Sequence, residues 1–271
     1  MMIEMLDVIR VLVALSSFIY ASWEDWKSRE IPDFIWILMS LTGVVLHAIE
    51  FTLTAADFER LKITLLFSSF SIIFAFTVGL LLFYLDFFGG ADSKALMALS
   101  ILMPLAPKVK WSSAETHPFI PIAVFNNSVI TASLMSIVML SKNLIDKLRG
   151  EDLFKGLEYE TIGKKILALI TGYKISANKL HERSFIYPIE EIKIVNGKTI
   201  RKLRIRIGAS SGEETLEQIL KLIERGQLRG KIWVTPALPM LIFITIGLIL
   251  ALTSGDLAYM LALLLKQTIT S

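Results

Sequence analysis

Residues 63–92 read ITLLFSSFSIIFAFTVGLLLFYLDFFGGAD, an apolar run that ends in a glycine pair and an aspartate. A helix that spans a bilayer needs about 20 mostly apolar residues, and 63–85 meets that length. Similar runs recur along the chain, so the predicted spans are 5–23, 34–53, 63–85, 93–105, 119–140 and 238–253. The sequence therefore predicts a mainly helical, polytopic membrane protein with six transmembrane helices.

The overall composition points the same way. Of the 271 residues, 54% are hydrophobic, compared with about 45 to 50% in soluble domains. No basic segment and cleavage site mark a removable signal peptide, so the first span is expected to stay in the mature protein. The chain has no cysteine, which excludes disulfides, thiolate nucleophiles and cysteine-ligated zinc. His47, His117 and His181 are too scattered to suggest a metal site.

A long polar segment separates the last two predicted spans. Residues 142–232 carry 19 Lys and Arg and 12 Asp and Glu. Helical spacing in 160–172, two β-rich runs about Asn196-Gly197 and a helix that ends near Arg225 predict a small α+β domain. The predicted domains are 1–142, a membrane domain with five helices, 143–232, a cytoplasmic soluble domain, and 233–271, the last helix and a tail. The basic charge does not require a nucleic-acid partner, because cytoplasmic parts of membrane proteins are commonly basic.

Six spans fix which loops share a side of the membrane. Both termini fall on one side, and the loops 24–33, 86–92 and 141–237 fall on the other. Basic residues next to the spans favour the cytoplasm for the long loop, since the positive-inside bias counts charges near span ends. We therefore expect the cell membrane as the location, with both termini outside and the two shorter loops facing the cytoplasm.

Each of the two shorter loops holds an aspartate at a membrane edge. Asp25 opens DWKSREIPD and Asp92 closes FFGGAD. Alone, Asp25 is explained as one charge of a polar connection that Pro32 ends, and Asp92 as a helix N-cap. Together, two neighbouring carboxylates share a proton and titrate as a pair, so that one deprotonates water while the other donates a hydrogen bond to a carbonyl oxygen. This is the chemistry of an aspartyl protease.

Other charged residues beside the apolar runs have plainer interpretations. Asp7 and Asp256, at the outer ends of spans, are expected to be external interfacial residues. Asp86 is either a solvated loop residue or a third carboxylate of the site. Lys94 either extends to the interface or, if close enough, favours the charged form of Asp92.

Four stretches, in order along the chain, carry a more specific pattern: ASWEDWKSREIPDFIWI, GGADSKALMAL, HPFIPIAVFNN, and KIWVTPALPMLIFI followed by Gly255-Asp256. With these, the chain resembles the archaeal preflagellin (prearchaellin) peptidases. That family is related to the type IV prepilin peptidases and belongs to the GxGD class of membrane aspartyl proteases. The short GxGD pattern alone is weak evidence, whereas the upstream segment from Asp25 to the Ile31-Pro32 pair makes it specific.

The resemblance implies roles for particular residues. The catalytic aspartates fall on Asp25 and Asp92. The residues expected to support the catalytic loop are Gly89, Gly90, Ala91 and Lys94. The two glycines give the backbone access to conformations that other residues avoid, while Ala91 departs from the strict pattern by replacing its second glycine. Asp33 stands where bacterial relatives often have asparagine.

The resemblance also implies a substrate class. It implies six membrane helices, no metal or organic cofactor, and substrates that are prearchaellin or pilin-like precursors with a basic leader and a hydrophobic segment. Because cysteines are absent, we predict cleavage without N-methylation. Acidic residues near the site would attract a basic leader, the alternative being ordinary solvation; they are Glu24, Glu30 and Asp33. The basic soluble domain is expected to contact membrane lipids or to position the loops.

Three other functions fit parts of the sequence. A presenilin-like protease would cut inside a span, whereas the segment from Asp25 to Pro32 points to a cut at the cytoplasmic border. A proton or cation transporter would use the aspartates as ion-binding groups. A noncatalytic assembly or scaffold protein would use the soluble domain alone. The sequence leaves the oligomeric state open.

Overall fold

The computed structural model describes residues 2–108, 117–180, 185–195, 198–204, 209–228 and 230–270. The chain divides into two compact units, of which unit 1 comprises Met1–Ala132 and Pro239–Ser271, and unit 2 comprises Ser133–Leu238. The assignment of a membrane domain and a cytoplasmic domain to parts of the chain stays a prediction.

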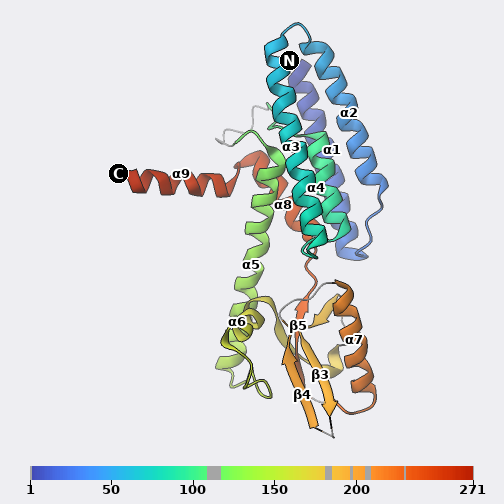
Figure 1. Cartoon of the computed structure of the whole chain (residues 1–271), viewed down its shortest axis with the longest axis vertical. Helices are drawn as coiled ribbons and strands as arrows, with labels where there is room; N and C mark the ends of the chain where they lie inside the picture. Colours follow the sequence, from blue (N-terminus) through green and yellow to red (C-terminus); the bar gives the residue numbers. More distant parts are fainter. Residues whose placement is uncertain are drawn as a thin grey trace. The chain divides into compact units, whose positions relative to one another are not determined.

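Unit 1 is built from helices. α1 (Met2–Lys27), α2 (Phe34–Thr54), α3 (Phe58–Tyr84) and α4 (Gly90–Leu102) lie side by side (Figure 1). The first part of α5 (Ile120–Leu148), α8 (Met240–Thr253) and α9 (Leu257–Thr270) complete the unit. α4 contacts α1, α2, α3 and α8, and α8 also packs along α1. The short helix α4 is therefore surrounded by the other helices.

Small residues allow these helices to approach closely. Ala14, Ala21, Ala95 and Ala98 are almost fully buried in the core of unit 1. Gly43 on α2 faces α4 so closely that a Cβ there would lie 2.6 Å from backbone atoms. Close backbone approach at small residues is common where helices associate in membranes.

Several helices have the length and composition of membrane spans. Among the described residues, α2, α3 and α5 pass this test singly, and α8 with α9, bent by 54°, passes it as one broken span. Large apolar side chains cover the outer faces of α2 and α3. These helices indicate a membrane protein that is mainly helical, as predicted.

The fourth predicted span is short, and the segment after the last one is helical. The prediction at 93–105 falls in α4, which has only 13 residues and is short of the 20 or so that a span requires. The segment after the last predicted span, expected as a tail, forms helix α9. The total of six spans stays a prediction.

Unit 2 contains the strands. β1 (Tyr173–Ser176), β5 (Lys231–Pro236) and β2 (Ile186–Pro188) form an antiparallel sheet with β5 in the middle. β3 (Glu190–Val195) pairs antiparallel with β4 (Lys198–Leu203). The other elements are α6 (Ile162–Thr171), the 3-10 helix η1 (Ala177–Lys179) and α7 (Ala209–Glu224). The predicted helices and paired strands are confirmed, while the Asn196-Gly197 turn lies outside the described residues.

A charged residue lies at the centre of unit 2. Glu190 is fully buried beside Trp233. Its carboxylate accepts hydrogen bonds from Arg201 at 2.7 and 2.8 Å and from the Trp233 backbone N–H at 2.7 Å. Burial raises the pKa of Glu190, and the charge of Arg201 opposes that rise. The pair joins β3, β4 and β5, which gives it a structural role.

Candidate active site

Asp25 lies in the last turn of α1 and is buried, with 6% of its surface exposed. One carboxylate oxygen is 3.4 Å from Nη1 of Arg29. The other oxygen accepts the backbone N–H of Leu241, in the first turn of α8, at 3.3 Å. The first backbone N–H groups of a helix have no partner within it and attract negative charge. The start of α8 therefore helps to hold the Asp25 carboxylate.

Asp92 lies in the first turn of α4 and is partly buried. Gly89 is the N-cap residue, and its backbone N–H donates to Asp92 Oδ2 at 3.0 Å. Gly89 has ordinary dihedral angles (φ −68°, ψ 161°), so the expectation that it supplies an unusual backbone conformation was wrong. A Cβ at Gly89 would lie 3.2 Å from Asp92 Oδ2. The glycine leaves room for the carboxylate.

The two aspartates are brought together by the packing of α1 against α4. Their charges act on each other, and Asp92 also experiences the charge of Arg29. Ala91, beside Asp92, packs on the apolar core of unit 1. Two carboxylates within electrostatic reach of each other have coupled protonation states.

The residues predicted to flank the site occupy different positions. Lys94 forms an ion pair with Asp33 at 2.7 Å, and both side chains are at least half exposed. Lys94 therefore binds Asp33, on the connection to α2, and its predicted role beside Asp92 stays a prediction. Gly90 is partly buried, Glu24 is partly buried and Glu30 is exposed.

Two family models match separate parts of the chain. Residues 12–136, which include both aspartates, match the type IV leader peptidase family. Residues 164–257 match a family described as Archaeal Peptidase A24 C-terminus Type II. The N-terminal half of the chain, which contains both aspartates, is thus similar to the type IV leader peptidase family.

Proteins with similar sequences come from Methanococcus and Methanocaldococcus. The preflagellin peptidase of Methanococcus maripaludis is 27% identical over 256 residues, which cover 92% of this chain and 96% of the relative. The preflagellin peptidase of Methanococcus voltae has the same identity and coverage. That of Methanocaldococcus jannaschii is 24% identical over 257 residues, covering 92% and 95% of the two chains.

The chain also has buried polar clusters that its sequence pattern did not predict. Asp7 is 7% exposed and binds Arg10 at 2.7 Å, while Arg10 binds Glu50 at 2.6 Å and His47 at 3.2 Å. The expectation that Asp7 is an external interfacial residue was wrong. Asp7 and Arg10 lie on α1, and Glu50 and His47 lie on α2, so the cluster joins these helices.

Asp256 was also misplaced by the sequence interpretation. It is fully buried at the start of α9. Oδ2 lies 2.6 Å from Nε2 of His117 and accepts Nδ2 of Asn126 at 2.8 Å. Oδ1 accepts backbone N–H groups of Ala258 and Tyr259. His117 and Asn126 belong to HPFIPIAVFNN, so the cluster joins this stretch to Gly255-Asp256.

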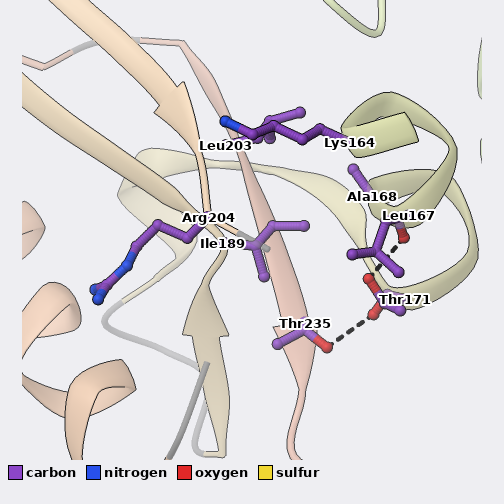
Figure 2. A pocket seen from close by; sticks show the side chains of 8 residues that line it. All are labelled: Lys164, Leu167, Ala168, Thr171, Ile189, Leu203, Arg204 and Thr235. Atoms are coloured by element: carbon purple, nitrogen blue, oxygen red, sulfur yellow. Dashed lines mark hydrogen bonds between the residues drawn. The ribbon is translucent and has the colours of Figure 1, made fainter. Parts of the chain in front are cut away.

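Unit 2 contains a separate cavity of about 200 Å³. Figure 2 shows it between α6 and the strands, with Thr235 donating its hydroxyl to the backbone carbonyl of Thr171. None of the lining residues is acidic; they are Lys164, Leu167, Ala168, Thr171, Ile189, Leu203, Arg204 and Thr235. This cavity offers no carboxylate pair.

Over the part of the chain that the structure describes, no group of three or more His, Asp or Glu side chains could hold a metal ion.

Proposed function

We propose that this protein is a membrane aspartyl endopeptidase that removes the basic leader from archaellin or pilin-like precursors. The family and the names of the relatives support leader processing. The observation that carries the proposal is the placement of Asp25 and Asp92 on contacting helices, where their charges interact.

Peptide hydrolysis by this pair needs one ionised and one protonated carboxyl group. The ionised aspartate takes a proton from water as the water oxygen attacks the scissile carbonyl carbon. The protonated aspartate stabilises the carbonyl oxygen and transfers its proton to it. When the tetrahedral intermediate collapses, the proton taken from water passes to the leaving nitrogen. The pair ends in its starting protonation state.

The proposal includes the predicted topology. The protein crosses the membrane several times, the aspartates face the cytoplasm, and cleavage takes place at that surface. Asp25 and Asp92 lie at helix ends, where a substrate can approach from water. The enzyme cleaves without methylating the new N-terminus.

Cleavage of a tagged precursor in membranes that contain the protein tests this function. We expect one product, cut between the basic leader and the hydrophobic segment, and no cleavage in membranes without the protein. A cut inside the hydrophobic segment would instead favour the presenilin-like alternative. An N-methylated product in the presence of a methyl donor would contradict the absence of methyltransferase activity.

The acidic flank of the site can be tested in the same membranes. Charge reversal of Glu24 and Glu30 is expected to slow cleavage of a basic leader, because opposite charges speed encounter. The effect should weaken with added salt. Unchanged cleavage would remove these residues from substrate attraction.

A further inference from the structure

Arg29 has an unusual backbone conformation for an arginine. It follows the end of α1 at Lys27 and has φ 61°, in the left-handed region. Its backbone N–H donates to the Glu24 carbonyl at 3.3 Å and so closes the helix. Glycine is the usual residue at such a position because it has no Cβ. Strained residues of this kind cluster at functional sites, so the side chain is expected to have a use.

The side chain of Arg29 reaches the aspartate pair. Nη1 is 3.4 Å from Asp25 Oδ1, and only 21% of the side chain is exposed. The guanidinium charge also acts on Asp92. The sequence pattern alone does not distinguish Arg29 from the other charges near Asp25, because the direction of its side chain depends on the left-handed backbone.

The surroundings of the two carboxylates differ. Each lies at a helix N-terminus, Asp25 at that of α8 and Asp92 within that of α4, so helix dipoles favour charge on both. The close ion pair with a guanidinium is made by Asp25. A neighbouring cation stabilises the charged form of a carboxyl group.

The other charged groups at this end of unit 1 do not reverse this difference between the surroundings of Asp25 and those of Asp92. On the elements packed against α1, Lys94 of α4 and Asp33 before α2 bind each other. The first turn of α8 contributes the Leu241 backbone N–H and has neither acidic nor basic side chains. The end of α1 also holds Glu24 and Lys27, and the connection after it holds Glu30. Glu30 and Lys27 are exposed, and Glu24 is partly buried.

We infer that Arg29 is a positioning residue that holds Asp25 as the ionised base and leaves the shared proton on Asp92. The inference rests on the proposed function. Asp25 then takes the proton from water as the carbon–oxygen bond forms, and Asp92 gives its proton to the carbonyl oxygen. As the carbon–nitrogen bond breaks, the leaving nitrogen receives the proton from Asp25, and Asp92 recovers its own.

The test is the pH dependence of kcat/KM for precursor cleavage by the purified full-length protein. Arg29→Gly removes the cation and suits the left-handed backbone, so it should unfold at or above the wild-type temperature. The acid limb of its pH profile for kcat/KM should move to higher pH by about one pH unit, because the Asp25 base ionises less readily without the cation. At pH values below this limb, kcat/KM of Arg29→Gly should be about tenfold lower than that of the wild type. Arg29→Gln, a neutral side chain of similar length, should show the same shift.

Two further variants distinguish a local effect of the Arg29 charge from a general effect of the charge in this region. Arg29→Lys keeps the charge and should hold the limb close to its wild-type position. Lys27→Ala removes an exposed cation from the same region and should leave the profile unchanged. A purely structural role for Arg29 would lower stability in Arg29→Gly and Arg29→Gln without moving the limb.

The outcomes distinguish this inference from the proposed function. Wild-type protein that does not cleave the precursor, or full cleavage by Asp25→Asn, overturns both. Cleavage that depends on both aspartates, with Arg29→Gly and Arg29→Gln profiles that superimpose on the wild type, overturns the inference alone. An equal shift in Lys27→Ala would also overturn it, because the effect would then be one of total charge.

Discussion

Replacing Gly43 by alanine tests how the fold positions Asp92. The new Cβ would stand 2.6 Å from the carbonyl oxygen of Ile101 and from Cα of Leu102 on α4, whereas ordinary contact begins at 3.4 Å. The shortfall is about 0.8 Å. Since both obstructing atoms belong to the backbone, α4 or α2 has to move. Overpacking of this kind typically costs about 1–3 kcal/mol.

The displacement should also affect catalysis, because Asp92 lies on α4. A misplacement of about 1 Å can cost about 100-fold in rate. We expect Gly43→Ala to lower the midpoint of thermal unfolding in detergent and to slow precursor cleavage by about 10- to 100-fold. Both quantities are measured on the same purified sample.

Gly79 on α3 provides a matched control, because it also faces α4. Its added Cβ would meet the terminal methyl of Met97 at 3.1 Å, and that flexible side chain can rotate away. Gly79→Ala should therefore stay near the wild type in unfolding temperature and cleavage rate. Wild-type behaviour of Gly43→Ala, or equal damage in Gly79→Ala, would refute the idea that the α2–α4 backbone contact positions Asp92.

Three further substitutions test other contacts. Asp256→Ala should cost about 3 kcal/mol or more, seen as a lower unfolding midpoint, because it leaves His117 and Asn126 without their carboxylate; an unchanged midpoint would contradict the buried cluster. Burial raises the pKa of Glu190 in the folded protein. The contribution of Glu190 to the free energy of unfolding is therefore present below the ordinary glutamate pKa, and it is lost as the pH rises through the pKa of Glu190 in the folded protein. Arg201→Ala should increase that loss, so the thermal unfolding midpoints at pH 5 and pH 8 should differ more in the variant than in the wild type. An equal difference in the two proteins would contradict this expectation. Lys94→Ala breaks an exposed ion pair worth less than about 1 kcal/mol, so cleavage should stay within about fivefold of wild type; a larger loss would give Lys94 a role in the site.

Much of the fold could be predicted because apolar length and periodicity are local properties of the sequence. The long runs at 34–53, 63–85 and 119–140 became α2, α3 and α5, and the β-rich runs paired as β3 and β4. The short helix α4 shows the limit of that reasoning. Composition reveals that its residues are apolar, but not that neighbouring helices surround them.

The polar residues were harder to place, because their environment depends on partners far away in the sequence. Asp7 accepts the backbone N–H of Lys108 at 2.9 Å, and Asp256 binds His117. Neither partner is visible from the local pattern, which favoured an interfacial position for both aspartates. Asp25 and Asp92 could be identified as candidates because two arguments pointed to the same pair. Both residues lie in loops predicted on the same side of the membrane, and the residues that flank them resemble a known pattern.

The central claim is that Asp25 and Asp92 together cleave the precursor, and isosteric substitution tests it most directly. Initial cleavage rates should be measured for purified Asp25→Asn, Asp92→Asn and Asp86→Asn, after each is shown to unfold like the wild type. Asp86 is an exposed aspartate near Asp92 with φ 57°, a conformation that asparagine also tolerates. We predict losses of at least about 100-fold for Asp25→Asn and Asp92→Asn and a near wild-type rate for Asp86→Asn. Wild-type cleavage by either of the first two would contradict the account.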